Sequence, residues 1–568
     1  MAAHSSAPSH MPVPVRPRGA LLWCAILALM LTLLLEALDQ TIVGTALPRI
    51  IGQLHGLDRY TWTVSAYLLA STTLIPVVGK LSDQFGRKRF LLGGTALFLL
   101  GSVLCGSAQS IDQLIVFRAL QGAGGGIGIA LVFTAVGDLV PPDERGRWQG
   151  IVGAVYAVSA VSGPTLGGWL ADHGPLLGAL VTDASRWRWV FYINLPLGLV
   201  ALVTLGIFLP VQSPARAAGG ETVQHSIDSP GALLAAVATL CLLLGLTWSG
   251  ENTYSWSRPQ VIGALAAAAV LYAVLLAVEH RAREPILPLH LFRDREFAAV
   301  AALSVLTNMA LFGMAFYVPL YLQEVLGSSA TQSGASMTPF SVSIAVAGTL
   351  AGFAISTLKR NRTIAVLGAV VMAAGAVCLT QLTPATSLIH VSLFVSIAGL
   401  GIGALFTVVS VVSLNAVPPA EMGAGVGAVR YLGQIGGALG SAVVGTVVNT
   451  SFASESARRI PATLVRRLED TGVHLSSMPQ LLMDPAYRAA IARTPAGAAT
   501  RHSPFGATSA QTLASARQIQ QMLEQLFESL RLSLAAAIQH GLTAPLLCSA
   551  GAIVAACLLK ENANRSGS

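Results

Sequence analysis

Long apolar segments recur along nearly the whole chain. Between residues 20 and 559 they alternate with short polar segments, and most contain few or no charged residues. The hydrocarbon core of a bilayer is about 30 Å thick, so a helix needs roughly 20 apolar residues to cross it. The pattern therefore predicts an all-α polytopic membrane protein with fourteen transmembrane helices. The predicted spans are 20–48, 60–79, 88–108, 113–139, 148–170, 188–209, 230–249, 259–278, 297–322, 333–357, 363–382, 388–413, 423–449 and 533–559.

Composition excludes an ordinary soluble protein. Of 568 residues, 54% are apolar and 11% are charged, whereas soluble domains carry roughly 25% charged residues. The six cysteines lie in or beside apolar segments and form no CxxC pair, so no disulfide framework or metal site is expected. The sequence contains no Walker A pattern, no metal-spaced His/Cys set and no nucleophile elbow. We therefore expect no cofactor and no enzymatic activity.

The positive charge is distributed unevenly between the loops. The net charge is +8, and alternate loops on one side of the predicted membrane carry eighteen Lys and Arg residues against five in the short loops of the other side. Under the positive-inside rule this bias places both termini in the cytoplasm. The basic charge thus reflects topology and not binding to nucleic acid. No A-x-A site follows the first apolar segment, which continues to Pro48, so we expect an uncleaved span and not a signal peptide.

A weak internal repeat relates the two ends of the chain. The string PPDERG at 141–146 recurs as PPAEMG at 418–423, and GKLSDQFGR at 79–87 has a weaker counterpart, GFAISTLKR, at 352–360. Each pair lies in predicted cytoplasmic loops, so the two halves run parallel, as in transporters built from parallel repeats.

The repeat also predicts the domain organisation. The offset leaves room for two helices beyond a six-helix repeat, which gives a plan of six, two and six spans. We predict an N-terminal six-helix bundle (1–210), a linker with two extra transmembrane helices (211–290) and a C-terminal six-helix bundle (291–568). Residues 450–531 are predicted to be an extracytoplasmic, partly helical insertion with amphipathic stretches near 457–470 and 512–531.

Three of the ionisable residues inside the apolar segments are candidates for proton coupling. Asp39 lies in LDQTIVGTALP (38–48), in a span whose first sixteen residues, 20–35, carry no charge. An ionised and unpaired carboxylate at that depth costs several kcal/mol, so Asp39 is a candidate proton carrier. Alternatively, it bonds to neighbouring helices for structure. Glu36, three residues earlier, could share the proton.

Arg118 is the third of these residues and lies in LIVFRALQGAGGGIGIA (114–130). A guanidinium stays charged, so it requires carboxylate or dipolar partners in the membrane. It could help to expel the proton from a nearby acid, or it could bond to helix ends as a structural residue. The glycines of this segment lack the spacing of a phosphate-binding loop and favour close helix packing.

The segment GKLSDQFGRKR (79–89), between the second and third spans, predicts a conformational latch. Gly79 permits close helix packing and Gly86 permits a tight turn. Asp83 can pair with charges that would have to separate when the protein changes state. Alternatively, the segment is a short basic loop that only sets topology. The candidate latch residues are Gly79, Asp83, Gly86, Arg87, Arg145 and Asp138.

The fifth span contains GAVYAVSAVSGPTLGGWL (153–170), followed by WRWVFYINLPLG (187–198). Pro164 lacks a backbone donor and is expected to bend the helix. Gly163, Gly167 and Gly168 would then let that bend approach other helices closely.

These motifs together resemble the fourteen-span drug/proton antiporter family of the major facilitator superfamily, the EmrB/QacA type. The family patterns are LDxTIVNVALP, with Gly44 in place of Asn here, GxLaDrxGrkxxl, lxxxRxxQGxgaa, GPxxGG and WRWxFxINxPxG. The resemblance covers roughly residues 20–450 and 533–559. It implies that the span-5 glycines seal the outer side against the opposite half.

The resemblance also implies a function. It favours a proton-coupled exporter of small, largely apolar compounds, monomeric in a bacterial inner membrane, with substrate, protons and the lipid bilayer as partners. Span 333–357 has no ionisable residue, although some family members carry an acid there, which argues against multivalent cations as substrates. A dedicated exporter of one metabolite (an antibiotic, a siderophore or an amino acid) would carry the same motifs. A receptor or scaffold without transport is disfavoured by the presence of Asp39, Asp83 and Arg118.

Overall fold

The structure is a computed structural model. This structure describes residues 19–54, 56, 59–140, 145–176, 178, 181–183, 185–210, 229–249, 258–281, 289–417, 422–460 and 510–561. All regular secondary structure in these ranges is helical.

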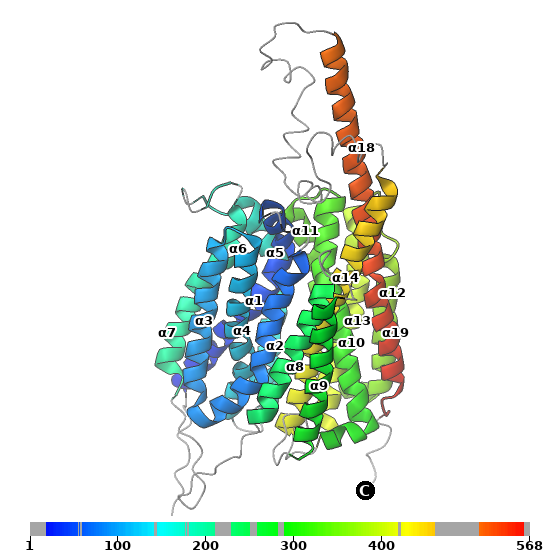
Figure 1. Ribbon diagram of the computed structural model, residues 1–568. Coiled ribbons are helices and arrows are strands. Elements are labelled where there is room, and N and C mark those ends of the chain that lie inside the picture. Colours follow the sequence, from blue (N-terminus) through cyan, green and yellow to red (C-terminus); the bar gives the residue numbers. More distant parts are fainter. Residues whose placement is uncertain are drawn as a thin grey trace, which may run out of the picture.

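The described chain forms long helices joined by short connections (Figure 1). In chain order they are α1 (Ala20–Leu54), α2 (Tyr60–Phe85), α3 (Arg87–Ser107), α4 (Ile111–Leu139), α5 (Arg145–His173), η2 (Arg186–Arg188), α6 (Trp189–Tyr192), α7 (Asn194–Phe208), α8 (Ser229–Ser249), α9 (Pro259–Glu279), η3 (Leu289–Arg293), α10 (Arg295–Leu320), η4 (Tyr321–Val325), α11 (Ala330–Leu358), α12 (Asn361–Leu379), α13 (Leu388–Asn415), α14 (Met422–Arg459), α18 (Ala510–Gly541) and α19 (Thr543–Cys557).

A helix lies at each of the fourteen predicted positions. A helix at a predicted position does not by itself show that the chain crosses the membrane there. In the described chain, ten helical segments are long and apolar enough to cross a membrane, and two shorter apolar stretches lie at Trp62–Ile75 and Leu233–Leu246. The structure thus supports an all-helical multi-pass membrane protein. The count of fourteen spans remains a prediction.

Several boundaries differ from the prediction. The first helix does not end at Pro48 but continues to Leu54 with this proline inside it. The segment between the second and third spans is also not a loop, because α2 extends to Phe85 and α3 begins at Arg87. Gly86 is the single residue between them. Polar residues at a helix end can remain helical outside the apolar layer, which hydropathy does not reveal.

The predicted insertion 450–531 has different boundaries as well. Helix α14 continues through its first ten residues to Arg459, and α18 begins at Ala510 and runs without a break past residue 531 to Gly541. Most of the predicted stretch 457–470 lies outside the described residues. Both helices therefore extend beyond their predicted apolar spans at the same end of the molecule, where α18 rises above the bundle (Figure 1).

The helices stand side by side as an upright bundle in which two groups meet. Helices α1 to α7 pack against one another, as do α10 to α19. The groups meet where α5 packs against α11 and where α2 packs against α14. These two contacts are equivalent under the sequence repeat, because α2 corresponds to α11 and α5 corresponds to α14. The turn between α2 and α3 and the C-terminal end of α19 lie at the bottom of Figure 1, opposite the protruding α18.

The extra helices α8 and α9 lie beside the junction of the two groups. Helix α8 packs against α2, α9 and α14. The buried Thr239 hydroxyl of α8 lies 2.9 Å from the Tyr272 hydroxyl of α9 and 2.8 Å from the Tyr431 hydroxyl of α14. This polar contact ties the linker helices to the C-terminal group.

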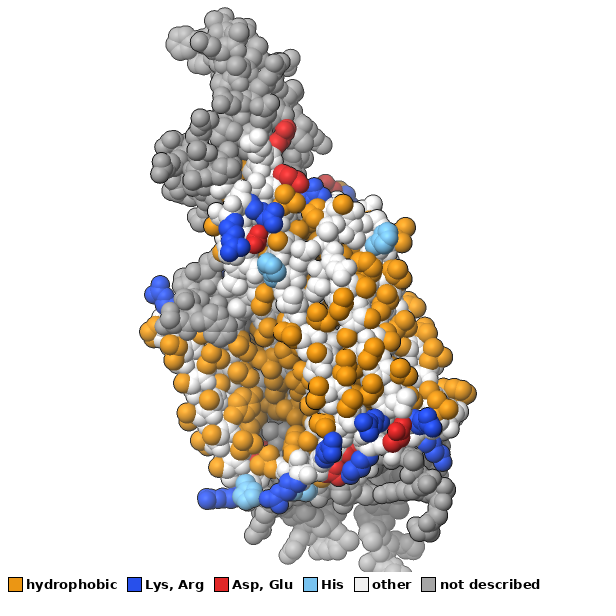
Figure 2. All heavy atoms as spheres, turned by 90° about the vertical axis from the view of Figure 1, so that its right-hand side faces the viewer, with side chains coloured by type: hydrophobic (Ala, Val, Ile, Leu, Met, Phe, Trp, Pro, Cys, Tyr) orange, Lys and Arg blue, Asp and Glu red, His pale blue; other side chains and the backbone are white. Residues whose placement is uncertain are grey.

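The surface between the two ends of the bundle is apolar. On the face seen in Figure 2, hydrophobic side chains cover a broad belt, and charged side chains gather above and below it. Large side chains such as Ile389, Leu547 and Phe353 are exposed. Contiguous exposed apolar surface of this extent is stable against lipid and not against water.

Candidate functional site

Asp39 lies at the centre of a buried hydrogen-bond network inside the N-terminal group. Its side chain is fully buried, and Arg118 of α4 donates through Nη1 to Asp39 Oδ2 at 2.7 Å. The other carboxylate oxygen, Oδ1, accepts from Gln121 Nε2 and from Asn194 Nδ2, each at 2.8 Å. Two donors from α4 and one from α7 therefore converge on one carboxylate of α1, and both helices pack against α1.

The same network reaches further helices. Ser102 Oγ of α3 accepts from Gln121 Nε2 at 2.8 Å and from Asn194 Nδ2 at 3.2 Å. The Arg118 guanidinium lies over the Tyr67 ring of α2, 4.2 Å from its centroid. A cation gains attraction from the face of an aromatic ring, and more so where water is excluded. Arg118 Nη1 also donates to Gln121 Oε1 at 2.8 Å. The guanidinium is thus held by a carboxylate, an amide and an aromatic ring in a site from which the protein excludes solvent.

This geometry fits the ionised form of Asp39. Bonds to charged groups are stronger than neutral ones, and removing one partner of a buried ion pair costs roughly 3–5 kcal/mol. The three donors occupy three of the roughly four lone-pair sites of the carboxylate, and a proton on the remaining site would remove the charge that the Arg118 guanidinium contacts. The charge of Asp39 therefore links α1 to α4 and α7.

Glu36 lies one turn before Asp39 but outside this network. Its side chain is buried, and neither carboxyl oxygen has a hydrogen-bond partner among the described residues. It lies against α4 at Gly128, where an added Cβ would overlap the carboxyl group. The structure therefore brings Asp39 and Arg118 together and leaves the neighbouring Glu36 outside their hydrogen bonds.

Sequence reasoning missed three members of the network: Ser102, Gln121 and Asn194. Gln121 and Asn194 lie inside two quoted motifs, at the QG of the span-4 string and the IN of the string after span 5. An uncharged polar side chain in an apolar helix carries a weaker signal than a charge, because it is cheaper to bury.

The span-5 glycines lie at the end of the bundle opposite Gly86. Gly168 of α5 touches α11 so closely that a Cβ would overlap the backbone carbonyl of Ala330. In return, a Cβ at Gly334 of α11 would overlap the backbone carbonyl of Pro164. Gly163 and Gly167 instead lie against Thr41 and Ile42 of α1, within their own group.

Polar contacts accompany this close packing. The Tyr60 hydroxyl of α2 donates to the Phe316 carbonyl of α10 at 2.7 Å, and Gln323 Nε2 donates to the Thr45 carbonyl of α1 at 2.7 Å. The Thr165 and Thr338 hydroxyls also contact each other across α5 and α11. The two groups are therefore joined at this end by both packing and hydrogen bonds.

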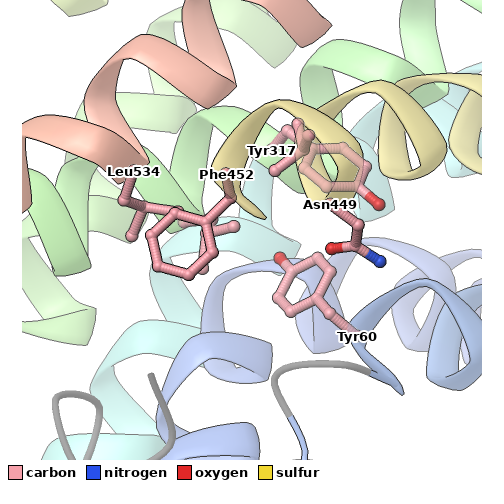
Figure 3. A pocket seen from close by; sticks show the side chains of 7 residues that line it. Tyr60, Tyr317, Asn449, Phe452 and Leu534 are labelled. Atoms are coloured by element: carbon pink, nitrogen blue, oxygen red, sulfur yellow. The ribbon is translucent and has the colours of Figure 1, made fainter. Parts of the chain in front are cut away.

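A small pocket remains beside these contacts. It is lined by side chains from α2, α10, α14 and α18, with Tyr60 and Tyr317 facing Asn449 and Phe452 (Figure 3). The two tyrosine rings lie 5.3 Å apart between centroids. The pocket is thus an aromatic gap between the two groups at their closed end.

At the other end, the structure describes only part of the predicted latch. Gly79 lies within α2, and Arg87 is half-buried at the start of α3. The side chains of Asp83, Asp138 and Arg145 are outside the described part of the chain, so their predicted pairing is not placed. Gly86 has φ +90°, in the region that favours glycine, and its N–H donates to the Ser82 carbonyl at 2.9 Å.

Comparison with known protein families decides the classification of this fold. The family model described as Major Facilitator Superfamily matches residues 29–441. The chain belongs to the major facilitator superfamily. The function class is therefore membrane transport and not catalysis, which implies a small-molecule substrate and a lipid bilayer around the protein.

Curated relatives cover most of this major facilitator chain. Multidrug resistance protein 3 of Bacillus subtilis (strain 168) is 35% identical over 433 residues, which are 76% of this chain and 80% of the relative. Multidrug transporter protein MdtP of the same organism is 35% identical over 426 residues, 75% of each chain. Efflux pump FUS6 of Gibberella fujikuroi is 32% identical over 453 residues, 79% of each chain.

A solved structure supports the fold. A bacterial homologue of the human lysosomal transporter Spinster, in an inward-facing and occupied conformation, matches with a TM-score of 0.63. The match covers 95% of this chain and 97% of the other at 16% identity, so it supports the shared fold alone.

The turn at Gly86 gives a test of the predicted latch. Gly86→Val places a β-branched residue at φ +90°, which costs of order 1–3 kcal/mol locally, and should slow turnover roughly tenfold without preventing insertion. Asp83→Asn should also slow transport. Initial transport rates, normalised to protein in the membrane, check both variants. Gly178→Val, at a positive φ of 58° in the loop after α5, is the matched control. Normal rates in both latch variants would leave the segment as a topology signal only.

Proposed function

We propose that this major facilitator protein is a proton-coupled antiporter that exports small, largely apolar drugs or toxic compounds. It works in the bacterial cytoplasmic membrane as a monomer with fourteen spans of the EmrB/QacA type. Both termini face the cytoplasm, so the end closed by α5 and α11 faces outward.

The observation that carries the proposal is the buried pair of Asp39 and Arg118. A carboxylate and a guanidinium in the interior of a membrane bundle are expensive to keep and mark proton or ion pathways by default. Here the carboxylate can exchange Arg118 for a proton, because protonation removes the charge that holds the guanidinium. Asp39 is the proton carrier in this proposal, with Arg118 assisting release and Glu36 as a neighbouring acid.

The cycle follows from the two ends of the bundle. With α5 and α11 in contact, the outer end is closed and Asp39 holds its donors in the ionised form. Opening of the outer end lets substrate leave and a proton reach Asp39. The return to this state restores the Arg118 contact and releases the proton inside.

The proton gradient is large enough for this exchange. One elementary charge moved across 100 mV yields about 2.3 kcal/mol, and tenfold accumulation of a neutral substrate costs about 1.4 kcal/mol. At roughly 150 mV, one proton per substrate could sustain a gradient of a few hundredfold.

The names of the relatives support export of foreign compounds, because two of them are named for multidrug resistance or multidrug transport. A dedicated exporter of one metabolite is the second candidate. A relative from Aspergillus aculeatus, 30% identical over 451 residues, is named Acurin A biosynthesis cluster MFS-type transporter. A receptor or scaffold that has lost transport is the third.

A susceptibility panel and a proton assay separate these three functions. Expression in a host that lacks its own efflux pumps should raise resistance to several unrelated apolar compounds. In inverted vesicles with an acid lumen, the same compounds should release protons from the lumen, and vesicles without the protein should not. Resistance to one compound class alone would support the dedicated exporter. Proton release by no compound would contradict antiport.

A further inference from the structure

A carboxylate at the closed end of the bundle joins helices of both groups. Asp172 lies near the C-terminal end of α5, four residues after Gly168. We propose that Asp172 is an outer latch, which holds the two halves together by binding α1 and the N-terminus of α11 at once. The inference rests on the proposed function, because a latch of this kind matters when the halves separate during transport.

Asp172 binds both halves through different oxygens. Arg49 of α1 donates to Oδ1. Oδ2 accepts from the backbone N–H of Thr331 at 2.7 Å and from the Thr331 hydroxyl at 2.6 Å. The Asp172 side chain is 11% exposed and that of Arg49 is 27% exposed, so the cluster is largely shielded from solvent. A single carboxylate thus receives donors from α1 on one side of the junction and from α11 on the other.

The N-terminus of α11 is suited to receive this carboxylate. The first backbone N–H groups of a helix have no partner within the helix, and an acidic side chain there is also favoured by the helix dipole. Ser329 and Gln332 form a capping box, in which the side chain of each accepts a hydrogen bond from the backbone N–H of the other. The Thr331 N–H instead donates to Asp172 of the opposite half. The start of α11 therefore depends on a residue from across the junction for one of its free donors.

Asp172 binds the start of α11 directly beside the close contact between Gly168 and Ala330. Thr331 adjoins Ala330, whose carbonyl lies against Gly168, and the Thr331 hydroxyl also lies 3.3 Å from the Gly168 carbonyl. The glycine contact supplies shape but little attraction, whereas bonds to an ionised carboxylate are roughly twice as strong as neutral ones. Close packing therefore permits closure, and Asp172 holds it.

The test measures opening of the outer end in purified full-length protein. Asp172→Asn keeps an oxygen that can accept from Thr331 but removes the charge that binds Arg49 and the helix N-terminus. Ala330→Cys, at a buried position, reports opening through its reaction with a soluble thiol reagent. We expect Asp172→Asn to raise the labelling rate about tenfold, as loss of a charge-assisted bond predicts. The background lacks native cysteines except the fully buried Cys105, which must stay unlabelled and so excludes unfolding.

A second measurement, the rate of cross-linking across the junction, should fall where the labelling rate rises. Cysteines at Thr165 and Thr338, whose hydroxyls touch across the junction, should cross-link readily in the otherwise unchanged protein and about tenfold more slowly with Asp172→Asn. Asp183→Asn is the matched control. This carboxylate lies in the loop after α5, is 83% exposed and pairs with Arg186 at the start of η2, so neither rate should change.

The result that overturns the latch is unchanged labelling and cross-linking in Asp172→Asn. An equal effect of Asp183→Asn would also overturn it, because the cause would then be general surface charge. Neither measurement needs a substrate or a proton gradient. The latch can therefore fail while antiport stands, and antiport can fail while the latch stands.

Discussion

Asp39→Asn is expected to abolish substrate-driven proton movement while substrate binding persists. The amide imitates the protonated carboxyl in shape and charge but cannot release a proton at any stage of the cycle. It also leaves Arg118 without its counter-charge, and removing one partner of a buried ion pair costs roughly 3–5 kcal/mol. Proton release from inverted vesicles and binding by the purified protein check the two parts. Asp112→Asn is the matched control, because this carboxylate pairs with Arg59 at an exposed site.

A double variant separates proton transfer from structural support. Asp39→Asn with Arg118→Gln removes both charges of the pair, so neither is left without its partner. Its thermal stability should therefore recover relative to Asp39→Asn alone. Recovery of transport along with stability would mean that the pair is structural. Undiminished proton coupling in Asp39→Asn alone would move the carrier role to Glu36 or Asp138.

Gly168→Ala is expected to reduce transport at least about tenfold, because the added methyl group blocks closure of the end at which α5 meets α11. The Cβ would overlap the Ala330 carbonyl, and backbone cannot move aside as a flexible side chain can. Overpacking costs typically about 1–3 kcal/mol, and about 1.4 kcal/mol is tenfold in an equilibrium. Initial rates of substrate uptake into inverted vesicles check this prediction.

Two further glycine variants sharpen this test. Gly334→Ala makes the reciprocal overlap with the Pro164 carbonyl and should have the same effect. Gly93→Ala, on α3, is the matched control, because no atom lies within 4 Å of its added Cβ. Alanine is also the better helix former by about 0.5–1 kcal/mol, so the control should be at least as stable as the parent. Normal transport in both junction variants would contradict a role of this contact in the cycle.

The charged and the uncharged residues of the Asp39 network differ in how far the sequence could predict them. Asp39 and Arg118 were identified because a charge in an apolar helix is costly and therefore rare. Their pairing at 2.7 Å could not be derived, since they lie 79 residues apart on different helices. Ser102, Gln121 and Asn194 carry no charge, so only their convergence on Asp39 identifies them.

The end at which α5 meets α11 shows the same limit. The proline and glycines of span 5 are visible as a string, but the sequence does not say which glycine faces which helix. Gly168 touches the opposite half, whereas Gly163 and Gly167 touch α1. Asp172 lies just beyond the predicted end of the fifth span at residue 170, where a carboxylate is expected to be solvated. In the folded chain, Arg49 and Thr331 enclose it.

The sequence by itself determined the class of the protein, its helical positions and the side chains that are costly to bury. These follow from local quantities: the length of an apolar segment and the cost of a charge within it. The tertiary structure decided where helices continue beyond the apolar layer, which donors surround Asp39 and which carboxylate joins the two halves. These depend on contacts between residues distant along the chain, and no local pattern encodes which faces of two helices will meet.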